Sequence, residues 1–403
     1  RAPHKDPRDL ATLRQDFLFR GHWGAADAAP HFFIRRRTDA FAGTYCMEIS
    51  AMNGAIAGLE QEQTALKSMD LADWRQHALE LESEVAKAVV GQDRAIRLMV
   101  IAIFARGHVL LEGDVGVGKT TLLRAVARTL GGVYERVEGT IDLMPSDMIY
   151  YTFLNEEGKP RVEPGPVLRH GSDLSVFFFN EINRARPQVH SLLLRLMAER
   201  SITAFNTEHS FPHLLVFADR NRIEREETFE LPAAARDRFL MEVAIATPPD
   251  EESRRQLLFE TRFHDVDALI GTLKEGVVDY RQLNALAKVI QSSITVSPAL
   301  ERYTLDLWNA VRNPASAGLN VAGVDVGKLV AGGASPRGMS YLIRAARVSA
   351  WLTGRDMVVP EDIRDIFYEC MAHRIFLAPV YELRREELVR ALISDVFAKV
   401  PAP

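Results

Sequence analysis

Eight consecutive residues have the types and spacing that hold phosphate groups. The run GDVGVGKT at 113–120 fits the pattern GxxxxGKT, in which backbone N–H groups and the N-terminus of the next helix surround phosphate oxygens. In that pattern Lys119 reaches the β- and γ-phosphates of a nucleotide, and the hydroxyl of Thr120 binds Mg²⁺. We therefore predict phosphate contacts from the loop and the residues around its lysine: Gly113, Asp114, Val115, Gly116, Val117, Gly118, Lys119, Thr120 and Thr121.

The segments on either side of this loop are those that the chemistry requires. HVLLEG at 108–113 is a short apolar run ending in glycine, which predicts a strand. TTLLRAVARTL at 120–130 has helical periodicity and is followed by Gly131 and Gly132, which predicts a helix that ends there. The order strand, glycine loop, helix favours a nucleotide site over a chance glycine turn.

A second polar pair stands at the end of an apolar run. In VFFFNEINR at 176–184, Asn180 and Glu181 follow four apolar residues, where P-loop ATPases usually carry Asp-Glu. We predict that Glu181 activates the attacking water and that Asn180 lies near Mg²⁺. An amide keeps the acceptor oxygen but loses the negative charge, and hydrogen bonds to ionised groups are about twice as strong as neutral ones. Asn180 alone therefore predicts weak Mg²⁺ retention and slow hydrolysis that needs high Mg²⁺.

Strand and helix signals alternate as far as residue 249. The amphipathic stretch 71–90 and the stretch 189–200 read as helices. Further strand candidates lie at 133–139, 174–179, 213–219 and 239–245. This alternation predicts an α/β core whose mostly parallel sheet has helices on both faces.

Helical periodicity dominates after Pro248 and Pro249. The predicted helices cover 252–262, 280–293, 298–312, 336–353, 360–372 and 383–398, and the Gly-, Ala- and Val-rich segment 313–334 reads as a long loop. We predict an irregular N-terminal extension at 1–46, an ATPase core with N-terminal helices at 47–249 and a helical lid at 250–403. His373, in AHRI, reads as a packing or lid-surface histidine.

The composition excludes several classes of function. The 403 residues are 47% hydrophobic and 26% charged with a net charge of -5, which is typical of a globular protein without an electrostatic footprint for nucleic acid or anionic membrane. The run HFFIRRR at 31–37 reads as a solvated segment in an extension that can also bind something. The longest apolar run, 98–105, is much shorter than the ~20 residues of a membrane span. Cys46 and Cys370 match no zinc or disulfide pattern, so we expect a reducing, cytoplasmic environment.

Four ordered motifs resemble the MoxR family of AAA+ ATPases: GDVGVGKT, NEINRARP at 180–187, ELPAAARDRF at 230–239 and GASPR at 333–337. VVGQD at 89–93, LMPSD at 143–147 and PGPV at 164–167 agree with it, and the resemblance runs from about Val89 to about Arg374. It implies an α/β P-loop AAA+ core, with a parallel sheet between helices, followed by an all-α lid domain. It also implies ATP and Mg²⁺, a hexameric ring, a client protein that is remodelled, and a partner with a von Willebrand A type, metal-binding domain.

The resemblance also implies roles for residues outside the phosphate loop. Gly91 and Gln92 would lie near the adenine, and Asn221 would be a sensor that helps to orient water. Arg238 would be the arginine finger that reaches the nucleotide of the neighbouring subunit. Arg337 would be a second sensor that couples the nucleotide state to the lid.

The chain departs from the family pattern near these residues. Val115 stands where the family often has proline, and Ala233 where it usually has glutamate. Asp219, Arg220 and Arg222 replace the usual neighbours of Asn221, in ADRNR against ATQNP. We expect these changes to affect hydrolysis rate and intersubunit geometry more than ATP binding.

Two stretches resemble the hairpin insertions of related rings. They cover 148–167 and 201–211, and they either face a pore and touch a client or only stabilise the ring. Two rival functions remain open at this point: the ATPase subunit of a metal chelatase, and a scaffold that binds ATP without turning it over.

Overall fold

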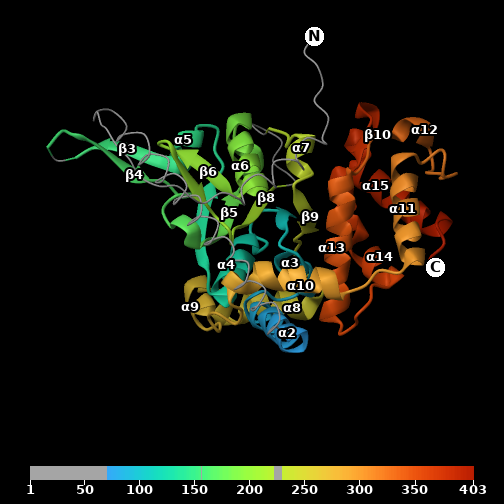
Figure 1. Ribbon diagram of the computed structural model, residues 1–403, viewed down its shortest axis with the longest axis horizontal. Coiled ribbons are helices and arrows are strands. Elements are labelled where there is room, and N and C mark those ends of the chain that lie inside the picture. The colour runs from blue at the N-terminus through green and yellow to red at the C-terminus, as the bar shows by residue number, and fades with distance from the viewer. Residues whose placement is uncertain (1–69, 156, 222–228) are drawn as a thin grey trace, which may run out of the picture. The chain divides into compact units, whose positions relative to one another are not determined.

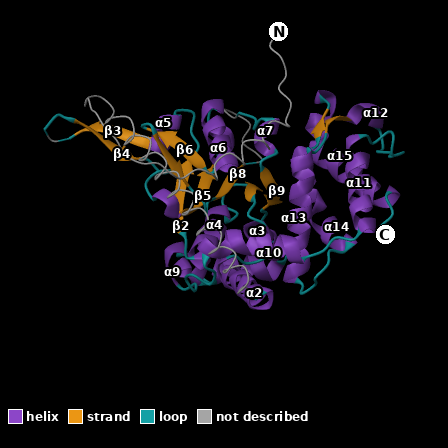
Figure 2. Ribbon diagram, viewed as in Figure 1, coloured by secondary structure: helices purple, strands orange, loops and turns teal. Residues whose placement is uncertain are grey.

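The computed structural model describes residues 70–155, 157–221 and 229–403 (Figures 1 and 2). The predicted extension at 1–46, Cys46 and the first part of the predicted core, 47–69, lie outside the described residues. All the described residues belong to one structural unit. Within the described ranges, no helix has the length and apolar character that a bilayer crossing needs.

Five strands of the described residues form a parallel sheet that positions the phosphate loop. The strand order is β2 (Val133–Glu138), β5 (Leu174–Asn180), β8 (Leu215–Arg220), β1 (His108–Glu112) and β9 (Phe239–Ala244). All four neighbouring pairs are parallel, as the sequence predicted. Because parallel strands end at the same edge of a sheet, the residues that follow β1, β5 and β8 come together there.

Both faces of this sheet are buried because side chains alternate along each strand. Val109 and Leu111 of β1 face a core that includes α2 (Leu71–Ala88), α3 (Asp93–Phe104) and α4 (Lys119–Leu130), whereas Leu110 faces a second core with α6 (Pro187–Glu199). Phe178 and Phe177 of β5 divide in the same way. The predicted α/β core with helices on both faces is therefore confirmed (Figure 2).

The helix after the phosphate loop begins and ends at glycines. Gly118 and Gly131 flank α4, and both have left-handed backbone angles, which glycine adopts without a steric cost. The helix buries Leu122, Leu123 and Val126. This packing fixes the N-terminus of α4, and with it Lys119, at the end of β1.

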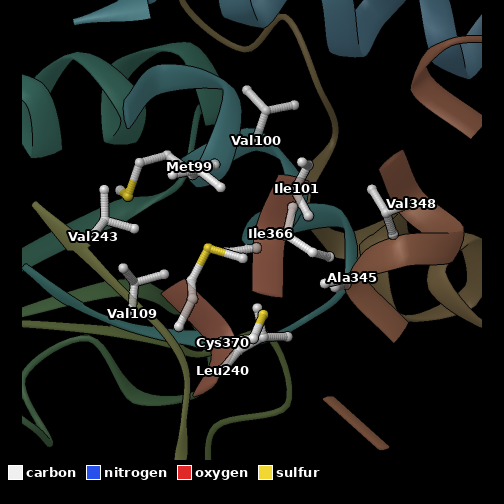
Figure 3. Packing of buried hydrophobic residues seen from close by; sticks show 14 of the residues in the cluster. Met99, Val100, Ile101, Val109, Leu240, Val243, Ala345, Val348, Ile366 and Cys370 are labelled. Atoms are coloured by element: carbon white, nitrogen blue, oxygen red, sulfur yellow. The ribbon is translucent and has the colours of Figure 1, made fainter. Parts of the chain in front are cut away.

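The chain is mainly helical after residue 249. The helices are α8 (Glu251–Phe259), α9 (Val266–Gly271), α10 (Leu283–Ser293), α11 (Pro298–Arg312), α12 (Val326–Leu329), α13 (Pro336–Leu352), α14 (Pro360–Met371) and α15 (Arg385–Lys399). α9 packs against α4, whereas α13 packs against α3 and β9, and α14 packs against β9. Figure 3 shows this second junction, where Val243 of β9, Met99 of α3 and Ile366 of α14 share one core.

The predicted loop at 313–334 is only partly a loop. It contains α12 and the short strand β10 (Val330–Gly332), which pairs antiparallel with β11 (Phe376–Leu377). The partner strand lies more than 40 residues further along the chain, so local composition gave no sign of this pairing. The 3₁₀ helices of the described residues are Gly171–Asp173, Ile182–Arg184, Thr261–Phe263, Tyr280–Gln282, Ala372–Arg374 and Pro379–Arg384.

Both predicted hairpins are present. β3 (Tyr150–Leu154) pairs with β4 (Pro160–Pro164) after the short helix α5 (Pro145–Ile149), and it extends away from the sheet (Figure 1). β6 (Ser201–Ala204) pairs with β7 (Thr207–Ser210), and the two residues between them both have positive φ, as a tight hairpin turn requires. The short helix α7 (Ala233–Arg236) precedes β9.

Candidate nucleotide site

The loop between β1 and α4 has the open backbone of a phosphate cradle. Gly116 and Gly118 have φ of 80° and 89°, and a Cβ built on either would meet no heavy atom within 4 Å. The positive φ explains why glycine stands at both positions, and the open space explains how a ligand can approach the backbone. The first turn of α4 carries no acidic residue, so its N-terminal N–H groups are available to an anion.

Lys119 is buried at the centre of this loop and makes three polar contacts. Its ammonium donates to the carbonyl oxygen of Gly113 at 2.7 Å and to Oδ1 of Asn221 at 2.7 Å. It also lies 2.9 Å from Oδ2 of Asp219, which is 1% exposed. The lysine is therefore held in place by the ends of the neighbouring strands.

Asp219 and Asn221 connect Lys119 to Glu181. The backbone N–H of Glu181 donates to Oδ1 of Asp219 at 2.5 Å, and Nδ2 of Asn221 donates to the Glu181 carboxylate at 3.4 Å. Burial raises the pKa of Asp219, and the Lys119 ammonium and the Glu181 N–H oppose that rise. The Glu181 carboxylate also pairs with Arg184 at 2.9 Å. The four side chains of Lys119, Glu181, Asp219 and Asn221 form one connected network.

Asn180 lies beside this network and is nearly buried. Its Nδ2 donates a hydrogen bond to Oε1 of Glu138, which pairs in turn with Arg136 at 2.7 Å. An ionised aspartate at position 180 could not donate this hydrogen bond, because a carboxylate is an acceptor only. The amide at this position therefore fits a neighbour that is itself an acid.

Two neighbouring cavities share the phosphate loop. The first, of about 400 Å³, is lined mostly by polar and charged residues, among them Lys119, Thr120 and Glu181. The second, of about 280 Å³, is lined mainly by apolar residues from three parts of the chain, among them Val89, Pro248 and Phe263. Gly116, Gly118 and Thr121 line both. A polar chamber and an apolar one joined by a glycine loop suit the phosphates and the base of a nucleotide.

Most of the predicted nucleotide contacts line these cavities. They are Gln92, Val115, Gly116, Val117, Gly118, Lys119, Thr120 and Thr121, with Asn180, Glu181 and Asn221 in the polar cavity. Gly91, Gly113 and Asp114 are not among the described residues that line either one. Sequence reasoning missed Arg136, Glu138 and Asp219 in the polar cavity. Only Asp219 left a signal, as a departure from the family pattern beside Asn221.

The two predicted arginines are both next to Asp237, one through an ion pair and the other along the chain. Arg337 pairs with Asp237 at 3.2 Å, and Arg238 is the next residue along the chain. Ser335 and the buried Arg374 also donate to the Asp237 carboxylate. Neither Arg238 nor Arg337 is among the described residues that line the two cavities. The structure therefore joins the start of α13 to the segment before β9.

Two other sequence features have structural explanations. Arg220 lies between Glu112 and Glu242, at 3.2 and 3.1 Å, so this departure from the family pattern links three strands by ion pairs.

His373 is buried, and its Nε2 lies 3.3 Å from the carbonyl oxygen of Phe239. Burial lowers the pKa of this histidine well below the usual value. The prediction of a packing histidine is confirmed.

Comparison with known proteins agrees with this fold. Residues 108–241 match the family described as "ATPase family associated with various cellular activities (AAA)", and residues 325–395 match "AAA lid domain". A crystal structure of a Cytophaga hutchinsonii protein assigned as an ATPase has a TM-score of 0.70 and 30% identity, covering 87% of this chain and 99% of that chain. The class is therefore an AAA+ core with its lid.

Two relatives narrow the class to one family. The chain is 65% identical over 333 residues to Protein MoxR of Methylorubrum extorquens, covering 83% of this chain and 97% of that protein. It is 34% identical over 324 residues to Chaperone MoxR1 of Mycobacterium tuberculosis, covering 79% and 81%. The chain belongs to the MoxR family of AAA+ ATPases.

Proposed function

We propose that the chain binds ATP with its base in the apolar cavity and its phosphates on the loop at 113–120. The observation that carries this proposal is the shared lining of the two cavities by Gly116, Gly118 and Thr121. Bound phosphates would take the ammonium of Lys119 from its present acceptors, and the helix N-terminus of α4 would contribute backbone N–H groups. We also propose that Gly91, Gly113 and Asp114 act by shaping the loop and the base cavity.

We further propose that the site hydrolyses ATP with Mg²⁺. Thr120 and Asn180 line the same cavity and offer a hydroxyl and an amide oxygen, the hard oxygen donors that Mg²⁺ prefers, so the donor set fits the ion. When bound, the cation neutralises charge on the phosphates. Glu181 would accept a proton from the attacking water, and its contacts with Arg184 and Asn221 orient the carboxylate for that step.

The positions of Arg238 and Arg337 support a site that is completed by a second subunit. Arg337 pairs with Asp237, Arg238 follows Asp237 in the chain, and neither arginine is among the described residues that line the two cavities. A phosphate contact from Arg238 would then be made to the nucleotide of a neighbour, as in a ring, which we propose to be a hexamer. Arg337 is paired with Asp237, the residue before Arg238, so a contact between Arg238 and that nucleotide would shift Arg337 and couple the nucleotide state to the lid.

We propose that the ring remodels a client protein, together with a partner that carries a von Willebrand A domain. The name of the M. tuberculosis relative supports a chaperone role. The β3–β4 hairpin exposes Phe153, Leu154 and Val162, and the β6–β7 turn exposes Phe205, an apolar surface that can contact a client. Assistance with cofactor or metal insertion into an enzyme is our proposal for the outcome of that contact.

One variant tests hydrolysis and identifies the client. Glu181→Gln should retain bound ATP, so an affinity pull-down with this variant in ATP should enrich partners relative to the same experiment in ADP. Recovery of a von Willebrand A protein with an oxidoreductase supports the chaperone proposal. Recovery of a tetrapyrrole-biosynthesis subunit instead supports the chelatase rival. If the parent protein binds ATP and shows no turnover at any Mg²⁺ or chain concentration, the scaffold rival is correct.

A further inference from the structure

Position 180 carries an amide where an acid is expected, but the neighbouring strand β8 carries a carboxylate, Asp219. β5 and β8 are paired with Phe179 opposite Ala218, so the next residues, Asn180 and Asp219, lie side by side at the ends of the two strands. On the other side of β5, Asn180 is opposite Glu138. The amide therefore lies between two carboxylates, at the edge of the sheet where the phosphate loop begins.

Asp219 is held toward the proposed phosphate chamber. It lines the same cavity as Thr120 and Glu181, is 1% exposed, and its two oxygens contact the Lys119 ammonium and the Glu181 N–H. It is thus the buried carboxylate that pairs with the lysine of the phosphate loop, while Asn180 pairs with Glu138.

We propose that Asp219 is a positioning residue for the divalent cation and carries the negative charge that Asn180 does not. This inference rests on the proposed nucleotide site. When bound phosphates take the Lys119 ammonium, Asp219 keeps one hydrogen bond and loses its cationic partner. A buried carboxylate without a counter-charge is strongly unfavourable, so a cation beside the phosphates, acting directly or through its bound water, replaces the lysine as its partner.

The proposal changes the expectation for Asn180. If Asp219 on β8 supplies the negative charge that position 180 lacks, the parent protein should hydrolyse ATP without unusually high Mg²⁺. Asn180→Asp alone then places a third carboxylate between Glu138 and Asp219. Neighbouring carboxylates repel one another, which disfavours the ionised form of the new aspartate. The single change should therefore fail to improve the use of Mg²⁺, whereas the double change Asn180→Asp with Asp219→Asn should preserve it.

Calorimetry with a non-hydrolysable ATP analogue, in Mg²⁺ and in EDTA, tests the proposal. The quantity compared is the gain in affinity that Mg²⁺ confers on each protein. In Asp219→Asn we expect the gain in affinity from Mg²⁺ to be about tenfold smaller than in the parent, which corresponds to about 1.4 kcal/mol. The affinity of this variant in EDTA should be unchanged or higher, because a charge that repels the phosphates is removed. The double variant should recover most of the gain. Asp142→Asn, an equivalent loss of charge in an exposed turn, should behave as the parent.

The outcomes separate this inference from the proposed function. If the parent protein does not bind the analogue, the nucleotide site itself is wrong. If the parent binds it and Asp219→Asn keeps the full Mg²⁺ gain, only the inference fails. If Asp219→Asn weakens binding of the analogue equally in Mg²⁺ and in EDTA, and the double variant does not restore that affinity, Asp219 only supports the structure of the loop. This result would also overturn the inference. Circular dichroism of each variant establishes that the comparison is between folded proteins.

Discussion

Removing the charge of Lys119 should have two separable effects, one on stability and one on binding. Lys119→Met keeps the length of the side chain but leaves the Asp219 carboxylate buried at 1% exposure without its ion-pair partner. Removing one partner of a buried pair typically lowers the free energy of unfolding by about 3 to 5 kcal/mol. Protonation of Asp219 limits this loss, and it limits the loss more at lower pH, because neutralising a carboxyl group costs less free energy as the pH falls towards its pKa.

The double variant Lys119→Met with Asp219→Asn separates the two effects. It removes both charges, so its free energy of unfolding should return to within about 1 kcal/mol of the parent. Its affinity for ATP should stay low. A charged donor to phosphate contributes about 1.5 to 3 kcal/mol per hydrogen bond, so both variants should lose about 100-fold in affinity.

Urea unfolding followed by circular dichroism measures the first effect, and calorimetry with ATP measures the second. Lys328→Met, an exposed lysine on α12, is the matched control and should resemble the parent in both. Parental ATP affinity in Lys119→Met would remove the phosphate-loop assignment. A double variant no more stable than the single one would refute our account of the buried pair.

Three further predictions concern catalysis, assembly and pH. Glu181→Gln should bind ATP but release no phosphate, measured by a phosphate-release assay and by nucleotide retention in gel filtration; normal turnover would exclude Glu181 as the base. Arg238→Ala should bind ATP as the parent does and hydrolyse it about 10³-fold more slowly, and parental turnover per chain should rise with concentration; a concentration-independent rate, unaffected by this change, would exclude a finger acting between subunits. Burial lowers the pKa of His108 to about 3, and Nδ1 of its neutral ring accepts the Val216 N–H at 2.9 Å. Because its pKa in the unfolded chain is about 6.5, this histidine should lower stability as pH falls from about 6.5 towards 3, by about 2 kcal/mol at pH 5. Measured by urea unfolding, the free energy of unfolding should fall less steeply with decreasing pH in His108→Asn than in the parent.

Local patterns were sufficient for the elements that carry the chemistry. Strand β1, the loop at 113–118 and helix α4 follow from neighbouring residues, because glycine spacing and helical periodicity act over a few positions. The same holds for β5 with Asn180 and Glu181 at its end. The two hairpins were predicted for a similar reason, since alternation and turn residues lie within one short segment.

Contacts between distant segments could not be read in this way. The apolar cavity is formed by Val89 before the sheet and by Pro248 and Phe263 after it, and nothing in any one segment identifies the other two. The meeting of Arg337 with Asp237, beside Arg238, likewise depends on how the lid packs on β9.

Asp219 gives the clearest division between the two kinds of information. Residue order alone shows that a phosphate loop is followed by an apolar strand that ends in an amide where an acid is expected, and that an aspartate stands in an unusual place near Asn221. That the two positions are neighbours follows from the fold, because β8 lies between β5 and β1 in the sheet although it follows both in the chain. Strand order is set by the packing of both sheet faces, and it brings the Asp219 carboxylate to Lys119, 100 residues away.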